Sequence, residues 1–176
     1  LQGLIIVGDI DVDQIEQKIK TLFADVKMPE NAAERIWYPV PDNDEPIVYI
    51  GKDKEIDTPI VDIYFKHDAT PDSIKGSVLY LAQNYMMAAI ATMLNERFSE
   101  LAQSANPPFN MAFCSPDGDF FLCGTKKAFN ISAYTKDDGL SNAMKVLLQE
   151  VERVRRHGFT ESEYARARAN ILQQLE

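Results

Sequence analysis

The chain has 176 residues, of which 45% are apolar, so it can form one domain, or at most two small ones, around a hydrophobic core. Acidic residues outnumber basic ones by 27 to 18; the net charge of −9 argues against nucleic acid, whose phosphates need a basic surface. The longest apolar run, residues 85–91, is far shorter than the roughly 20 residues that cross a membrane, so no transmembrane segment is expected. Two histidines and two cysteines exclude a three-histidine metal site or a zinc ribbon built from this chain alone.

The first part of the chain predicts a strand, a helix and a long connection. Residues 4–8 form an apolar, β-branched run that is typical of a buried strand. A helix is predicted over residues 12–23, because Asp11 and Gln14 form a capping-box pattern before apolar residues at helical spacing. Residues 25–46 contain prolines among acidic residues and predict an extended surface connection. Three of its hydrophobic residues are expected to pack on the body: Ile36, Trp37 and Tyr38.

The middle of the chain predicts two strands and a long helix. Residues 47–50 and 60–66 are the strands, the second with alternating apolar and polar residues. Thr70 is expected to cap the helix, with Pro71 at its first position. Helical spacing of apolar residues continues to about residue 104, and the sequence predicts a bend in this helix near residues 92–95.

The last part predicts three strands and then two helices. The strands are expected at residues 110–115, 119–124 and 129–135. Residues 116–118, Pro-Asp-Gly, predict a hairpin turn between the first two. One helix is predicted over residues 138–157 with Gly158 at its end, and the next begins at Thr160, where Glu163 completes a capping box. The element order predicts an α+β layered fold: a largely antiparallel mixed sheet with helices mainly on one face.

The two ends of the chain predict a fragment of a longer, multi-domain polypeptide. Residue 1 is Leu instead of Met, and the apolar run of the first strand begins by residue 4. The final helix, residues 160–176, has no Gly or Pro stop signal. Residues 1–176 are therefore expected to be a single domain cut from a larger protein.

Three aspartates near the start resemble the beginning of a calcium loop: Asp9, Asp11 and Asp13. The sixth loop position is Gln14 where glycine is needed, and the twelfth is Lys20 where glutamate is needed. A turn followed by a helix cap explains the aspartates better than a metal site does.

The histidines and cysteines give no complete catalytic pattern. His67 and Asp68 could form an acid–base pair, but no nucleophile motif accompanies them, and a polar strand end is the better interpretation. His157 lies in the last turn of a predicted helix, where a cation is favoured by the helix dipole. Cys114 and Cys123 flank the predicted turn; they could form a disulfide or remain buried free thiols.

Arginines gather in the last two predicted helices: Arg153, Arg155, Arg156, Arg166 and Arg168. Residues 135–176 contain seven acidic and seven basic residues, so this region is interpreted as a mixed, solvated surface.

Three segments in order resemble the insulinase/pitrilysin family of zinc metallopeptidases. They are residues 5–11, with V-G-D-x-D, residues 95–101, N-E-R-F-S-E-L, and residues 158–163, G-F-T-E-S-E. The resemblance implies repeated α+β domains in two halves that close around a peptide. In that family zinc is held by H-x-x-E-H on a helix and a downstream glutamate. This chain has no H-x-x-E-H, so it resembles the inactive accessory domain, with zinc expected only in the parent's catalytic domain.

Two positions depart from the family pattern. Ala102 and Phe109 stand where active members of the family often carry, in the half without zinc, an arginine and a tyrosine that contact substrate. No catalytic, substrate-binding or metal residue is therefore assigned to this chain. The departure favours the second domain of the zinc-bearing half; a degenerate half without zinc is the alternative, because it would look similar. Residues 93–98 with residues 108–109 resemble long bacterial, periplasmic-type members.

The leading hypothesis is a non-catalytic domain of a zinc metalloendopeptidase that packs on the catalytic domain and helps to form the substrate chamber. Its expected partners are other domains of the same polypeptide and a peptide or protein substrate, in the periplasm or cell envelope. The alternative is a scaffold domain of a non-proteolytic homologue, similar to the respiratory core subunits. A third hypothesis, an unrelated α+β binding module, would need a closed apolar pocket with convergent polar groups.

Overall fold

The computed structural model describes residues 3–27, 30–34, 36–121, 123–136 and 138–175. The chain divides into two compact units, Leu1–Ile36 and Trp37–Glu176. Two residues of predicted elements, Leu122 and Glu176, lie outside the described residues. No helix among the described residues is long and apolar enough to span a membrane.

The first unit contains one helix, α1 (Val12–Leu22), close to the predicted range. Its capping is as expected: the Asp11 carboxylate accepts the backbone N–H of Gln14 at 3.0 Å. The prediction of a strand at residues 4–8 is wrong, since these residues form no ladder. A strand needs a neighbour to satisfy its backbone groups, and the described residues of this unit contain no second strand.

The second unit is built on a three-stranded antiparallel sheet in the order β1-β3-β2. Its strands are β1 (Ile60–Asp68), β2 (Met111–Asp119) and β3 (Lys126–Tyr134). Ile63 lies opposite Ile131, and Ile131 lies opposite Cys114, so three apolar side chains form one row across the sheet. Ile131 is fully buried in the core that the sheet shares with the helices.

The hairpin between β2 and β3 differs from the predicted one. Residues 116–118 do not turn the chain; β2 continues through them to Asp119, with an irregularity in its register between Ser115 and Gly118. Pro116 has no backbone N–H, so it cannot join the ladder, and the strand bulges instead of ending. The expected strand at residues 119–124 is wrong, because β2 ends at Asp119 and the described residues from Phe120 to Gly124 belong to no strand; Phe121 has a φ of +53°.

The long helix α2 (Val78–Ala102) begins later than predicted. Gly76 has a φ of +91°, which a right-handed helix does not admit, and Ser77 caps the helix by accepting the N–H of Tyr80 at 3.2 Å. Residues 71–76 therefore form turns, and Thr70 is not the cap. The helix is uninterrupted through residues 92–95, and its second half carries the buried side chains.

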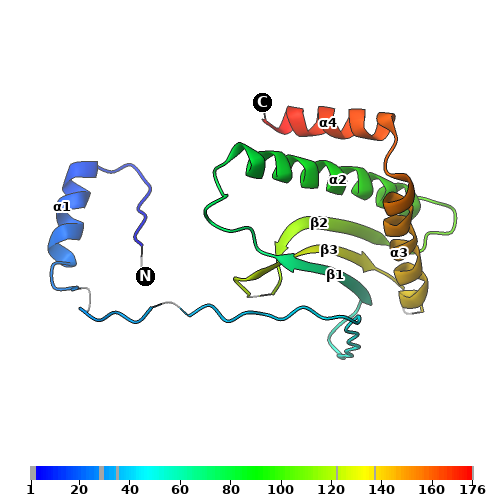
Figure 1. The fold of residues 1–176 in the computed structure, drawn as a ribbon, viewed down its shortest axis with the longest axis horizontal. Coiled ribbons are helices and arrows are strands. Elements are labelled where there is room, and N and C mark those ends of the chain that lie inside the picture. Colours follow the sequence, from blue (N-terminus) through cyan, green and yellow to red (C-terminus); the bar gives the residue numbers. More distant parts are fainter. Residues whose placement is uncertain (1–2, 28–29, 35, 122, 137, 176) are drawn as a thin grey trace. The chain divides into compact units, whose positions relative to one another are not determined.

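The last two helices are α3 (Leu140–His157) and α4 (Glu161–Leu175), as the sequence predicted. Figure 1 shows α2 lying over the sheet and α4 lying over α2. Ala143 and Leu147 of α3 are fully buried and pack in the same core as Phe98 of α2 and Ile131 of β3. The helices therefore share one face of the sheet, which confirms the α+β layered fold.

The chain before β1 follows the sheet without joining it. The prediction of a strand at residues 47–50 is wrong: each of these side chains is 74–89% exposed. Upstream, the Lys126 ammonium binds the carboxylates of Asp42 at 2.7 Å and Asp68 at 2.6 Å, which holds the connection to the start of β3. Trp37 lies against Gly124, where an added Cβ would come within 2.6 Å of its ring, although 53% of Trp37 stays exposed.

Candidate functional site

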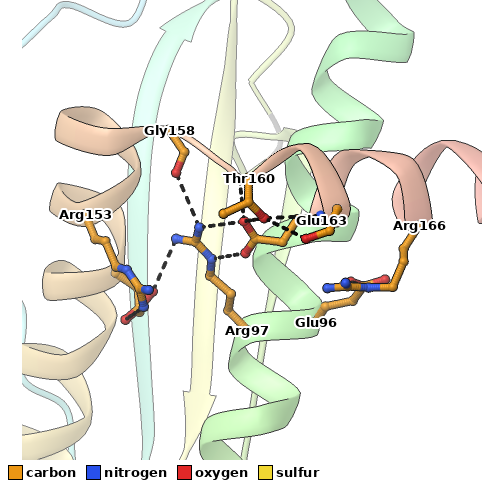
Figure 2. Close-up of polar contacts among 9 residues, drawn as sticks. Glu96, Arg97, Arg153, Gly158, Thr160, Glu163 and Arg166 are labelled. Atoms are coloured by element: carbon orange, nitrogen blue, oxygen red, sulfur yellow. Dashed lines mark hydrogen bonds and ion pairs between the residues drawn. The ribbon is translucent and has the colours of Figure 1, made fainter.

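Arg97, on the buried side of α2, makes several polar contacts within the second unit. Its guanidinium makes a two-pronged contact with Glu163 of α4, Nε to Oε1 at 2.6 Å and Nη2 to Oε2 at 3.0 Å (Figure 2). Nη2 also donates to the carbonyl of Gly158 at 3.3 Å, and Nη1 lies 3.6 Å from a carboxylate oxygen of Glu150 on α3. One side chain therefore joins α2 to both following helices.

Glu163 has a second partner at the start of α4. Its carboxylate accepts the backbone N–H of Thr160 at 2.6 Å and the Thr160 hydroxyl at 2.8 Å. In return, the N–H of Glu163 donates to the Thr160 hydroxyl at 3.3 Å, which completes the predicted capping box. The hydrogen bond from Arg97 is the largest of the causes that lower the pKa of Glu163 to about 2.

The turn between α3 and α4 contributes the backbone carbonyl of Gly158 to the contacts of Arg97. Gly158 has a φ of +67°, a conformation that glycine adopts without strain, and it ends α3 as predicted. The next residue, Phe159, places its ring 4.8 Å from the guanidinium carbon of Arg97. The guanidinium is therefore held by a carboxylate, a carbonyl and an aromatic face together.

The two residues before Arg97 make separate contacts. The side-chain amide of Asn95 accepts the N–H of Cys114 at 2.7 Å and donates to its carbonyl at 3.2 Å, which fastens α2 to β2. Glu96 contacts Arg166 of α4 at 3.3 Å (Figure 2). Three consecutive residues of α2 thus reach the sheet, α4, and the α3–α4 turn.

This cluster, which we call the Arg97 clamp (Asn95, Glu96, Arg97, Gly158, Thr160, Glu163), suits packing better than catalysis. Its carboxylates face cations, and the pKa of Arg97 is raised, chiefly by its bond to Glu163, so the guanidinium stays charged. Across the described ranges of the chain, no group of three or more His, Cys, Asp or Glu side chains could hold a metal ion.

The clamp assigns a role to two of the segments that carry the family resemblance, residues 95–101 and 158–163. The sequence did not show that they meet, since 66 residues separate Arg97 from Glu163. A signal was present, however. Arg97 lies between Leu94 and Phe98 on the apolar side of a helix, and an arginine there needs a buried acidic partner.

The two positions that depart from the family pattern lie in or beside the core. Phe109 is 2% exposed and meets the ring of Phe98 edge to face, with centroids 6.2 Å apart. Ala102 is the last residue of α2 and packs against the same core cluster. The structure therefore places both in packing positions.

His67 and Asp68 each have a contact of their own. The Nδ1 atom of His67 lies 2.9 Å from the backbone carbonyl of Asp68, while the Asp68 carboxylate binds Lys126. His157 occupies the last turn of α3, as predicted. The three aspartates at the start of the chain lie at the beginning of α1, with Asp11 as its cap.

The two cysteines are free. Cys114 lies opposite Ile131 in the ladder, whereas Cys123 lies beyond the end of β2, so the two do not face each other. Burial raises the pKa of Cys114 to about 12. The pKa of Cys123 is lowered, first of all by its hydrogen bond with the Thr125 hydroxyl at 3.1 Å.

We expect the two thiols to react at very different rates with Ellman's reagent at pH 8. Cys123, which is partly exposed and has a lowered pKa, should react fast, whereas buried Cys114 should react only when guanidinium unfolds the protein. Cys123→Ser should remove the fast phase and leave the slow one. Two fast thiols, or none before a reductant is added, would contradict the structure.

Comparison with known proteins identifies the family. The profile of the Peptidase M16 inactive domain matches residues 3–171, so the chain belongs to the peptidase M16 family. This confirms the expected family and its inactive accessory domain. A search of curated proteins gives no significant match.

Two solved structures share the fold. The crystal structure of the periplasmic protease PqqL from Escherichia coli aligns with a TM-score of 0.77 and 18% identity over 96% of this chain. The crystal structure of the first half of the same protease aligns with a TM-score of 0.70 and 17% identity over 96% of this chain. The chain spans 18% of the full protease and 35% of its first half.

Proposed function

We propose that the chain is a non-catalytic domain of a zinc-dependent metalloendopeptidase, where it packs on the catalytic domain and forms part of the chamber wall. The observation that carries the proposal is the match of the inactive-domain profile to residues 3–171. The Arg97 clamp supports it, because side chains of the family-like segments at residues 95–101 and 158–163 bind one another inside the domain.

We further propose where the domain lies in its parent. Residues 1–176 would be a single accessory domain in the first half of a longer polypeptide, next to the domain that holds zinc. The alignment with the first half of PqqL supports this position. That protease is periplasmic, which supports a periplasmic or envelope location for the parent. Ala102 and Phe109 would then pack in the core instead of binding peptide.

The test compares the complete parent polypeptide with this chain. We expect the parent to hold zinc, to hydrolyse unfolded polypeptides, and to stop when a chelator removes the metal. The 176-residue chain alone should hold no stoichiometric zinc and hydrolyse nothing. Zinc bound to the chain alone would contradict the proposal. A parent that lacks both H-x-x-E-H and hydrolytic activity would support the scaffold alternative.

A further inference from the structure

The outer side of α3 carries apolar side chains beside its buried face. Ala143 and Leu147 are fully buried, but three further apolar residues at i, i+4 and i+8 remain 38–44% exposed: Leu140, Met144 and Leu148. This row spans about 12 Å along the helix. A shallow, open groove of about 730 Å³ follows this side, with Met144 and Leu148 among its lining residues, all of which belong to α3.

The charges along the groove are opposite to those of the whole chain. The net charge of the chain is −9. The groove, in contrast, is lined by Lys145, Arg153 and Arg156 against one acid, Glu152, a formal balance of +2. The carboxylate of Glu152 is already paired, because Arg155 and Arg156 both bind it, at 2.6 and 2.5 Å, and hold its pKa at about 2.

We propose that this groove of α3 binds an acidic amphipathic helix from outside the chain. An apolar row with one residue per turn fits the apolar row of a second helix, whose side chains pack between the ridges of the first. Asp and Glu residues beside that row would face Lys145, and they would share Arg153 and Arg156 with Glu150 and Glu152 of α3. This inference does not depend on whether the parent is a peptidase.

The chemistry favours such a helix over other anionic partners. Glu152 interrupts the basic residues, and the chain's net charge of −9 would repel an extended polyanion such as DNA. An anionic membrane would need more apolar area than a row of three partly exposed residues supplies. The contact area is small, so we expect weak binding, with a dissociation constant on the order of 10 µM or above.

The experiment uses the full 176-residue chain and a fluorescein-labelled peptide of about 18 residues, with Leu at helical a and d positions and Glu at most others. Fluorescence anisotropy should show saturable binding that weakens several-fold when salt rises from about 50 to about 300 mM. A peptide with Lys in place of Glu should not bind.

Two variants of the groove should each weaken binding at least about tenfold: Lys145→Glu and Leu148→Ser. Lys75→Glu, the same charge change at an exposed position of the same unit that does not line the groove, is the matched control and should bind like the parent chain. Circular dichroism should confirm that each variant is folded. The proposal would be overturned if the peptide showed no saturable binding, or if both groove variants still bound it as the parent chain does. Equal binding of duplex DNA or anionic vesicles would also overturn it.

Discussion

Arg97→Ala is expected to lower the free energy of unfolding by about 3–5 kcal/mol, because it leaves the largely buried carboxylate of Glu163 without its cation and leaves Glu150 with Arg153 alone. The side chain of Arg97 is 10% exposed, and those of Glu150 and Glu163 are 13% and 14% exposed, so water can replace little of what is lost. Urea denaturation followed by circular dichroism measures the change.

Two further variants separate charge from geometry. Arg97→Lys keeps the charge but cannot donate two parallel bonds to Glu163, so it should recover only part of the loss. In a double-mutant cycle, Arg97→Ala and Glu163→Gln should be strongly non-additive, since each removes the same contact. Lys75→Ala, which breaks an exposed ion pair with Asp72, is the control. If the two losses of unfolding free energy were additive, or if Arg97→Ala cost no more than Lys75→Ala, Arg97 would not act as a clamp.

The same contact should make stability depend on pH. The pKa of Glu163 is about 2 in the folded chain and 4.5 when unperturbed, so its contribution is complete above about pH 5 and is lost as pH falls towards 2. Glu163→Gln should therefore flatten the stability curve in this acidic range. Glu152 has a similar pKa but lies on the surface, so about 1 M salt should screen its contribution and not that of Glu163.

Phe109→Ala should also cost about 3–5 kcal/mol, because it removes a ring that is 2% exposed and leaves a cavity beside Phe98. Phe109→Tyr restores the hydroxyl that the family pattern carries. In this core we expect it to cost about 1–3 kcal/mol, since burial of the ring would take the added hydroxyl out of water. Thermal and urea denaturation would measure both changes.

Leu79→Ala is a control for Phe109→Ala, because Leu79 lies in the same unit but is 70% exposed. Its loss of unfolding free energy should stay below about 0.5 kcal/mol. In the complete parent, Phe109→Tyr should reduce stability without increasing peptide hydrolysis. A stable Phe109→Tyr variant with faster hydrolysis would instead place residue 109 in contact with substrate.

Local signals predicted the helices well. The capping boxes at Asp11 and Thr160 and the glycine after α3 depend only on residues a few positions apart, and the structure confirms all three. Gly76 shows the limit of such signals: the Thr70-Pro71 pattern was a plausible helix start, but a positive φ at Gly76 delays the helix to Val78.

Strands and the clamp depended on partners that are distant in sequence. Residues 47–50 have strand-like side chains, yet they pair with no other strand. At Pro116, where the pattern predicted a turn, the strand β2 instead continues with a bulge. Likewise, the sequence identified the segments around Arg97 and Glu163 but not their contact, because the packing of α4 on α2 decides it.

The three contacts of Asn95, Glu96 and Arg97 also restrict how the gene can change. A single-residue insertion or deletion upstream in α2 would rotate everything after it by about 100° and shift it by about 1.5 Å. All three side chains would then miss their targets at once, whereas a substitution affects one contact. Length variation between homologous genes should therefore be absent from α2 and concentrate in loops such as residues 51–57, whose hydrogen bonds are local, for example from the N–H of Glu55 to the Asp53 carboxylate.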